Sequence, residues 1–391
     1  MVRFIHTGDW HIGVRRSFLA EKQKEWDRFR WKAMEGILRK AEEKEADFIL
    51  IAGDLFDHNQ ISESYINQAF NLLHRSPCPV MILPGNHDPL TYDSIYRQPQ
   101  WKKSTLLHVF FDSQPWQPPN LPEVVIHPAP VFQKSSKKDP AEFIKGIENK
   151  INIGLAHGNL MIPGKVEDSN FPIHPERAEI ASLDYLALGE WHTWLEWKDS
   201  KGVVRTLYPG TPEATNFGEK EPGFIAFVEI GGPGEAPKIE KIPVSTLKWE
   251  KLEFNLQNHG GVECLKEKVF SFEDSSKTLL QILSQGFLTA KERTILESKL
   301  LEWKELFFYF SMPLEKVHLK PSPEELREIS HKGGILGRMG EVLLSFEDKD
   351  QKREWKGEIP ENIGKNLENP EIREECWLKI YQILEKLGDM A

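Results

Sequence analysis

Short motifs that combine carboxylate, imidazole and amide side chains recur along the first half of the chain. Three of them are Asp9-Trp10-His11, Gly53-Asp54 and Gly85-Asn86-His87-Asp88, and two more are His157 and Gly189-Glu190-Trp191-His192. Divalent ions such as manganese accept this mixture of ligands. One aspartate can bridge two ions, and two ions about 3.5–4 Å apart can clamp the attacking and leaving oxygens of a phosphate ester. The residues therefore indicate metal-assisted hydrolysis of a phosphate ester.

Each motif taken alone also has a structural explanation. Asp9 and His11 could be a solvated polar pair, Gly53-Asp54 could be a turn, and His157 could be a hydrogen-bonded histidine of the core. The five motifs nevertheless follow one another in order, each at the end of a predicted strand. A glycine beside a ligand also lets the backbone bend sharply. We therefore interpret the five motifs as parts of one site.

The elements that must position these motifs alternate between strand and helix. Apolar runs predict strands at Phe4–His6, Phe48–Ala52 and Val80–Leu83, and helical periodicity predicts helices over Glu21–Glu45 and Ser62–His74. This order indicates an α/β sandwich, in which ligands lie beyond the carboxyl ends of the strands. Later strands are predicted at Val124–Ile126, Ile153–Ala156, Tyr185–Leu188, Thr206–Tyr208, Phe224–Ile230 and Lys238–Pro243.

The pattern changes near Thr246. We predict strands at Trp249–Leu256 and Phe307–Phe310, with Ser322 and Glu325 forming a capping box. Predicted helices cover Ser275–Ser284, Ala290–Trp303, Glu324–Ser330, Gly337–Leu344 and Glu371–Leu387. The last of these carries an apolar stripe, which could dock on a partner or pack on its own chain.

Size and charge limit the possible classes of protein. With 391 residues we expect two or three domains, and the net charge of −10 argues against a simple basic nucleic-acid binder. The last 51 residues hold 13 acidic and 8 basic side chains, hence a net charge of −5. We expect a cytoplasmic protein, because the three cysteines lie far apart and the sequence has neither a signal-peptide pattern nor an apolar run of membrane-spanning length.

The order of these motifs resembles the calcineurin-like metallophosphoesterases. The similarity is closest to the DNA repair exonucleases of the SbcD type, over about residues 1–244. It rests on residues 7–13 and 53–57, on Tyr208-Pro209-Gly210-Thr211-Pro212-Glu213 and on Phe217-Gly218-Glu219. The resemblance implies a two-layered β sandwich flanked by helices, a smaller α+β capping domain and a helical C-terminal tail. We expect these parts at residues 1–245, 246–345 and 346–391.

The resemblance also implies a role for each motif residue. Asp9, His11 and His192 would hold one metal ion, and Asn86, His157 and Glu190 the second, with Asp54 bridging the two. His87 would contact the scissile phosphate, and Asp88 would orient it. Glu190 stands where the family commonly has histidine, and the alternative is that it points to solvent and the second site is weak. A carboxylate there favours Mn²⁺, which we expect, or Mg²⁺.

Further expectations concern partners. The resemblance to the SbcD-type exonucleases implies a metal-dependent DNA exonuclease and endonuclease of DNA repair that works with an SMC-like ATPase. A homodimer would use the region Glu21–Glu45. Surface cations that could contact DNA phosphates are Arg15, Arg16, Lys134, Lys137 and Lys138. Trp10 and Trp191 could stack on bases, but packing around the site is the favoured interpretation. Two alternatives remain: a phosphoesterase for a small molecule or phosphoprotein, and a catalytically weak adaptor for DNA ends or the ATPase.

Overall fold

A computed structural model of the chain describes residues 1–166, 169–257, 259–320, 328, 331, 334–347 and 359–387. The chain divides into two compact units, Met1–Lys248 and Trp249–Ala391. This boundary lies three residues beyond the predicted one, and the separate assignment of 346–391 as a tail stays a prediction.

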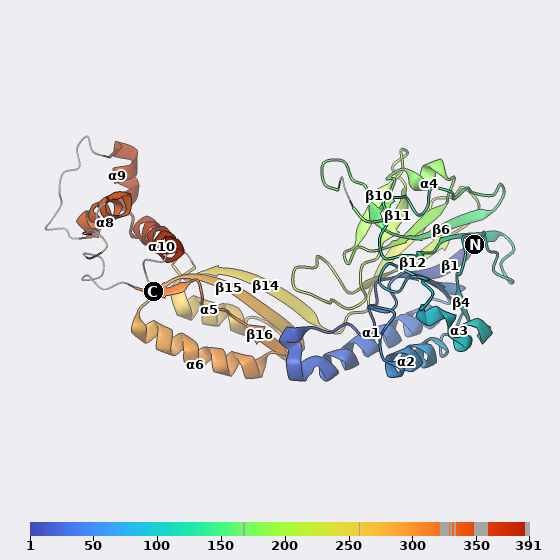
Figure 1. The fold of residues 1–391 in the computed structure, drawn as a ribbon, viewed down its shortest axis with the longest axis horizontal. Helices are drawn as coiled ribbons and strands as arrows, with labels where there is room; N and C mark the ends of the chain where they lie inside the picture. Colours follow the sequence, from blue (N-terminus) through green and yellow to red (C-terminus); the bar gives the residue numbers. More distant parts are fainter. Residues whose placement is uncertain are drawn as a thin grey trace. The chain divides into compact units, whose positions relative to one another are not determined.

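A six-stranded sheet in the order β13-β12-β1-β2-β3-β4 forms one layer of the first unit (Figure 1). The first four strands along the chain run parallel, and β12 joins β1 in the antiparallel sense. Strands β2 and β3 are buried along their whole length, as their continuous apolar sequences predict for a parallel sheet. The strands are β1 (Val2–Thr7), β2 (Phe48–Ala52), β3 (Val80–Leu83), β4 (Leu107–Val109), β12 (Phe224–Ile230) and β13 (Lys238–Pro243).

A second sheet, in the order β10-β11-β9-β6-β5, packs face to face with the first. Phe4 and Phe48 of the first sheet share one core with Ile126, Ile153 and Tyr185 of the second. The predicted two-layered β sandwich is therefore confirmed. Its second-sheet strands are β5 (Val124–Ala129), β6 (Ile151–His157), β9 (Tyr185–Gly189), β10 (Leu195–Lys198) and β11 (Val204–Tyr208), with a small pair, β7 (Asn159–Leu160) and β8 (Pro172–Ile173), beside it.

Helices cover the outer faces of the sandwich (Figure 1). Alternation along β1 turns Phe4 inward to the shared core, whereas Ile5 faces Met34 and Ile37 of α1. Ala178 of α4 packs against the outer face of the second sheet. The helices of this unit are α1 (Gln23–Glu43), α2 (Glu63–Leu73), α3 (Pro99–Lys103) and α4 (Arg177–Ile180), and a 3₁₀ turn (Ser17–Lys22) precedes α1.

The second unit is a smaller α+β structure with its own core. Its sheet has the order β14-β15-β16, with β17 also paired to β15, and Trp303 of α6 lies fully buried in the core. Thr289 and Glu292 form the capping box that starts α6. The elements are β14 (Lys248–Asn255), α5 (Gly261–Phe270), β15 (Thr278–Leu288), α6 (Ala290–Leu306), β16 (Tyr309–Ser311), β17 (Val317–Leu319), α8 (Gly334–Glu347), α9 (Glu361–Leu367) and α10 (Pro370–Leu387).

One predicted helix is wrong. Residues 275–284, expected to be helical, form a short 3₁₀ turn and then most of strand β15. Leucine, glutamine and isoleucine also suit a helix, but β15 pairs with strands on both sides, and that tertiary context outweighs the local preference. The predicted helix Glu324–Ser330 and the Ser322–Glu325 capping box fall almost entirely outside the described residues.

The last helix is partly covered by its own unit. Trp377 and Ile380 of α10 are buried against Phe287 of β15, whereas Ile383 remains exposed.

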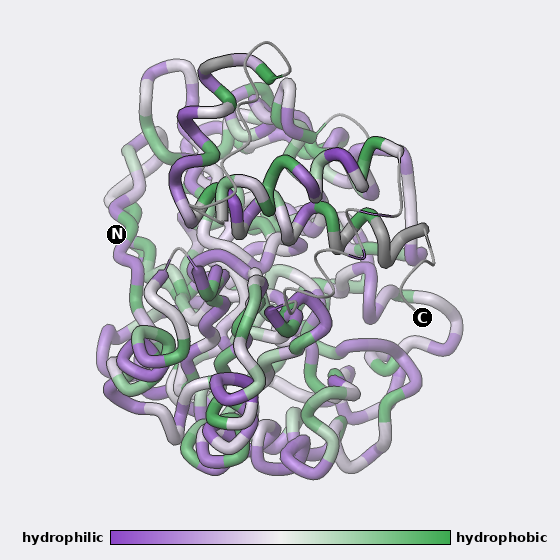
Figure 2. The backbone as a smooth tube through the Cα atoms, turned by 90° about the vertical axis from the view of Figure 1, so that its left-hand side faces the viewer, coloured by the Kyte–Doolittle hydropathy of each residue, from purple (hydrophilic) through white to green (hydrophobic). Residues whose placement is uncertain are grey.

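Figure 2 shows hydrophobic and hydrophilic segments interleaved along the tube. Among the described residues, no helix combines the length and the apolar character needed to cross a membrane.

Candidate metal centre

The polar motifs meet at one edge of the sandwich, where parallel strands of both sheets end. Asp9 and His11 follow β1, Asp54 follows β2, and Glu190 follows β9, while His157 is the last residue of β6. His157 Nδ1 lies 2.9 Å from the carbonyl oxygen of Ala52, so the two sheets are in contact at this edge. The convergence expected from the strand ends is therefore present in the structure.

The backbone at this edge is strained. Four of the motif residues have positive φ angles: Asp9 at 51°, His11 at 44°, Asp54 at 50° and Glu190 at 113°. Such angles are uncommon outside glycine and concentrate at functional sites. Gly53 permits a close approach of the two sheets, since a Cβ atom there would lie 2.1 Å from His157 Nδ1.

One group of donors consists of Asp9, His11 and His192, whose ligand atoms lie within 4.8 Å of one another. The Nε2 atoms of His11 and His192 are 2.9 Å apart. Both oxygens of Asp9 accept the backbone N–H of Glu190, at 3.0 and 3.1 Å, which fixes the carboxylate. These residues are the three assigned by resemblance to one ion.

A second group gathers around His157. Its Nε2 lies 2.9 Å from Asn86 Oδ1 and 3.0 Å from Glu190 Oε2. Glu190 Oε2 is buried and makes no hydrogen bond among the described residues. The carboxylate therefore points into the centre, contrary to the alternative in which it faces solvent.

Asp54 lies between the two groups. Its Oδ2 atom is 3.7 Å from His11 Nε2 and 3.4 Å from His157 Nε2, and its Oδ1 accepts the backbone N–H of His87 at 2.9 Å. A carboxylate in this position can reach an ion on either side. The seven side chains thus fit two divalent ions, as judged by donor type, convergence and the orphaned oxygen of Glu190.

The electrostatics of the centre favour added positive charge. Burial raises the pKa of Asp9 to about 7, against the opposing effect of His157 and His192. Burial alone would lower the pKa of His157, but facing Asp54 and Glu190 hold it well above the usual value. A site that stabilises a protonated imidazole in its interior also stabilises a bound cation, which is the larger local charge.

The sequence pattern of the calcineurin-like phosphoesterases matches residues 2–214, which include all of these donors. The chain belongs to this family. Members of the family hydrolyse phosphate esters with divalent metal ions, and the converging donors described above are the part of this chain that suits such ions.

Relatives point to one branch of the family. The chain is 24% identical over 247 residues to the DNA double-strand break repair protein Mre11 of Methanosarcina mazei, covering 60% of this chain and 37% of that protein. Over 91 residues it is 31% identical to the D chain of the SbcCD nuclease of Escherichia coli K12, covering 22% of this chain and 21% of that protein. The similarity thus spans well under half the length of these relatives.

Among solved structures, TT1561 of Thermus thermophilus aligns with 62% of this chain and 99% of its own length. The sequence identity is 12% and the TM-score is 0.39, so this similarity adds nothing to the assignment.

The expected role of Asp88 requires a correction. Its carboxylate is fully buried and accepts hydrogen bonds from the backbone of Gly85 and Phe56 and from the hydroxyl of Tyr96, at 2.7, 2.9 and 2.6 Å. His87 instead places Nδ1 2.7 Å from the backbone oxygen of Asp57. Asp88 therefore shapes the turn after β3, and Asp57 holds His87.

Asp57 was missed as a site residue. Its Oδ1 lies 3.5 Å from His11 Nδ1 and 3.8 Å from His87 Nδ1, and the two imidazole rings meet edge to face at 4.7 Å. Asp57 belongs to the motif at residues 53–57, but its proximity to His11 is a consequence of the fold and is not apparent from the sequence. Asp57 therefore lies close both to His11, a predicted metal ligand, and to His87, the histidine predicted to contact the phosphate.

Arg16, expected to contact DNA, has a different position. Its guanidinium donates to the carbonyl and hydroxyl oxygens of Thr215, at 2.6 and 3.1 Å. Thr215 in turn donates to Glu219, whose Oε1 lies 2.9 Å from His192 Nδ1. Arg16 is therefore connected through Thr215 and Glu219 to His192, one of the residues expected to bind metal.

The remaining predicted cations and tryptophans are distributed as follows. Arg15 is exposed, as are Lys134, Lys137 and Lys138, which lie in the loop after Val131. Trp10 is buried and donates to Thr7. Trp191 donates to Asn159 and stacks on the ring of Tyr208 at 5.3 Å. Both indoles take part in packing around the site, in line with the favoured interpretation.

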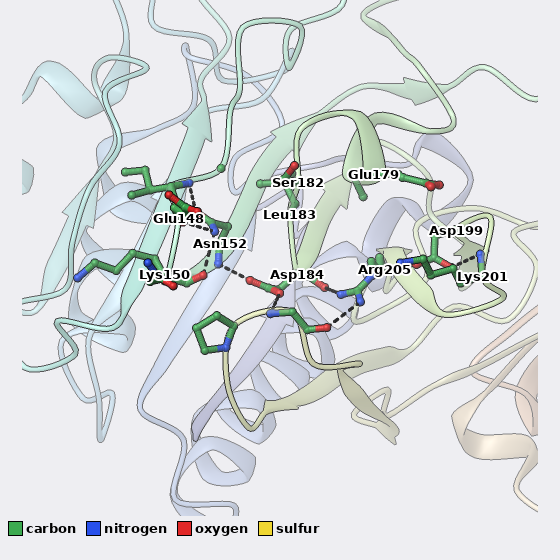
Figure 3. A pocket seen from close by; sticks show the side chains of 16 residues that line it. Glu148, Lys150, Asn152, Glu179, Ser182, Leu183, Asp184, Asp199, Lys201 and Arg205 are labelled. Atoms are coloured by element: carbon green, nitrogen blue, oxygen red, sulfur yellow. Dashed lines mark hydrogen bonds and ion pairs between the residues drawn. The ribbon is translucent and has the colours of Figure 1, made fainter.

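A polar pocket of about 530 Å³ lies at the opposite, amino-terminal ends of β6 and β9 (Figure 3). Asp184 accepts the backbone N–H groups of Asn152 and Gly234, at 2.7 and 2.6 Å. Arg205 pairs with Asp199 at 3.0 Å and donates to the carbonyl of Asp184. Asp184, Arg205 and their partners therefore form a polar network that braces the starts of these strands.

Proposed function

We propose that this chain is a metal-dependent DNA nuclease that hydrolyses phosphodiester bonds with two divalent ions. The observation that carries the proposal is the position of Asp54, whose one oxygen lies 3.7 Å from a donor of the first group and 3.4 Å from a donor of the second. The names of the relatives, a DNA break repair protein and part of a nuclease, support DNA as the substrate.

Each residue of the centre has a proposed role in metal binding or in catalysis. Asp9, His11 and His192 would hold one ion, Asn86, His157 and Glu190 the other, and Asp54 both. When bound, the ions supply Lewis acidity and a nucleophile at neutral pH. His87 has a side chain 44% exposed, and with Nδ1 held by Asp57 its other ring nitrogen can meet the leaving oxygen of the substrate.

The ion is proposed to be Mn²⁺, with Mg²⁺ as the alternative. Asp9, Asp54, Asn86 and Glu190 contribute oxygen donors, and His11, His157 and His192 contribute nitrogen donors. Three imidazoles exceed what Mg²⁺ normally accepts, whereas Mn²⁺ takes both donor types.

DNA binding is proposed to use exposed cations of the first unit. Arg15 is one, and Lys134, Lys137 and Lys138 form a second group. Contacts of this kind neutralise phosphates without reading sequence, so each lost contact should lower the slope of log affinity against log salt by about 0.9. Arg16, which also donates to Thr215, is proposed as a further contact.

The second unit is proposed to cap the substrate, and the exposed side of α10 near Ile383 to contact an SMC-like ATPase. A homodimer through α1 and a cytoplasmic location complete the proposal. Co-purification of the chain with a coiled-coil ATPase would support the complex, and a nuclease that is fully active alone would argue against it.

The test is nucleotide release from linear DNA by the metal-free chain after addition of MnCl₂. We expect release that depends on Mn²⁺ and is abolished in Asp54→Ala and His87→Ala variants. Equal rates in the wild type and these variants would contradict the proposal. A parallel assay with a small chromogenic phosphodiester separates the alternatives: activity on that compound alone indicates a small-molecule phosphoesterase, and activity on neither indicates an adaptor.

A further inference from the structure

Glu190 occupies a position where histidine is common in the family, and its carboxylate is held from two sides. Oε2 lies 3.0 Å from His157 Nε2, within the second donor group. Oε1 accepts a hydrogen bond of 3.2 Å from the side-chain amide of Asn159, in the first residue of β7. An imidazole is a rigid ring, whereas a glutamate side chain must be fixed by a partner before one of its oxygens can serve as a ligand.

Asn159 can present only its amino group to Glu190. The indole N–H of Trp191 donates to Asn159 Oδ1 at 2.7 Å, and an indole nitrogen can only donate. The NH₂ group must therefore face the other way, where it donates both to Glu190 and to the carbonyl of Asn170 at 2.9 Å. The backbone N–H of Asn159 is bound to Phe171 at 2.9 Å, so the residue itself is anchored.

The backbone of Glu190 reinforces this arrangement. Its φ angle of 113° is rare for a residue with a side chain, and its carboxylate lies 3.0 Å from His157. A strained backbone persists only where surrounding contacts hold it, and Asn159 supplies one of these contacts. Trp191, the next residue, is fixed at the same time because it stacks on Tyr208.

We propose that Asn159 is a positioning residue that converts Glu190 into a ligand of the second metal ion. The inference rests on the proposed two-ion centre. Asn159 holds Oε1 and leaves Oε2 beside His157 Nε2, within the second donor group. Partners of this kind change metal affinity about 10- to 100-fold when removed.

The test is calorimetric titration of the metal-free full chain with MnCl₂ alone. We expect two ions per wild-type chain, and the binding step lost in Glu190→Gln identifies the second ion. In Asn159→Leu that step weakens about 10- to 100-fold, while the affinity of the other ion changes less than about twofold. In the Glu190→Gln background, Asn159→Leu has no further effect, because the two residues act through one contact.

Asn170→Ala is the matched control. It changes the neighbouring asparagine but keeps the backbone carbonyl to which Asn159 donates, so both ions should bind as in the wild type. If Asn159→Leu does not fold, as judged by thermal melting, Asn159→Ser removes the same amide with a smaller change.

The inference would be overturned by unchanged affinity for the second ion in Asn159→Leu or by equal weakening of both ions in that variant. A loss of affinity in Asn170→Ala as large as that in Asn159→Leu would also overturn it. A wild-type chain that binds one ion would overturn it as well. Two bound ions without DNA hydrolysis would contradict the proposed function and leave the role of Asn159 intact.

Discussion

Asp54 links the two donor groups of the centre at the scale of single residues. In the proposed centre, removal of its carboxylate would take away a donor to both ions, whereas each of the other proposed ligands is assigned to one ion. Asp57 is not among the proposed ligands, but it faces the imidazoles of His11 and His87 and forms with them a further cluster of possible donors. The two aspartates, three residues apart, should therefore have separable effects.

The first prediction concerns Asp54→Asn. Phosphodiester hydrolysis should fall by more than about 100-fold, because removal even of a residue behind a ligand costs about 10- to 100-fold. Bound Mn²⁺ should fall below two ions per chain in the same protein. Retention of two tightly bound ions in Asp54→Asn would show that the aspartate does not bridge them.

The second prediction concerns Asp57→Asn. We expect kcat to fall about 10- to 100-fold while two Mn²⁺ ions still bind, because His11 remains a ligand and His87 loses a charged neighbour. Asp57→Asn should add little to His87→Ala if it acts through that histidine. A loss of one ion in Asp57→Asn would instead make Asp57 a support of His11 alone.

Strand ends and glycines determine the site at the scale of elements. Gly53 and Gly202 both have positive φ angles, 91° and 81°, but only Gly53 lies against another side chain. Alanine substitutions at these two glycines therefore distinguish the effect of backbone strain on stability from the effect of a clash between the two sheets.

Gly53→Ala should therefore reduce both stability and activity, because its Cβ would lie 2.1 Å from His157 Nδ1. Gly202→Ala, which has open space around it, should cost only the backbone strain of about 1–2 kcal/mol and leave activity unchanged. Urea unfolding and nuclease rates of the two variants test this. Equal effects in both would mean that the contact with His157 is readily relieved.

Burial of His6 in β1, where its Nδ1 lies 2.9 Å from the hydroxyl of Tyr185 in β9, also makes stability depend on pH. Burial lowers the pKa of His6 from 6.5 to about 3. The unfolded chain binds a proton at His6 below about pH 6.5 and the folded chain does not until near pH 3, so this group destabilises the fold as pH falls through that range. The contribution is at most about 1.4 kcal/mol per pH unit. His6→Gln should unfold with a smaller pH dependence between pH 6 and 4 than the wild type, by about that amount per unit, and an unchanged dependence would contradict the neutral state of His6.

Sequence patterns predicted most strands of the sandwich because each is an apolar run closed by a polar turn. Periodicity could not identify β15, since its leucines also suit a helix and only its neighbours make it a strand. The candidate metal ligands could be predicted as well, because they lie in the polar turns that follow these apolar runs. Glu219, Asp57 and Asn159 each contact a site residue that is distant in sequence, so these contacts depend on the fold and could not be predicted from spacing.

Every proposed metal ligand lies in the first of two compact units at the scale of the whole molecule. This unit ends at Lys248, and the sandwich has its own core. The net charge of −10 includes −5 from the last 51 residues, outside this unit. The overall charge therefore says little about the surface around the centre.

Residues 1–248 produced alone should fold and bind two Mn²⁺ ions with the affinity of the full chain. The reason is that all seven donors and their supporting residues belong to this unit. Circular dichroism and calorimetry check the fold and the stoichiometry. A folded fragment that binds fewer ions than the full chain would show that the second unit contributes to the centre.

The two-ion arrangement around Asp54 is the central claim, and anomalous X-ray diffraction from crystals soaked in MnCl₂ tests it most directly. We expect two manganese peaks about 3.5–4 Å apart, one beside His11 and His192 and the other beside His157 and Glu190, with Asp54 between them. A single peak, or two peaks that do not share Asp54, would contradict the account.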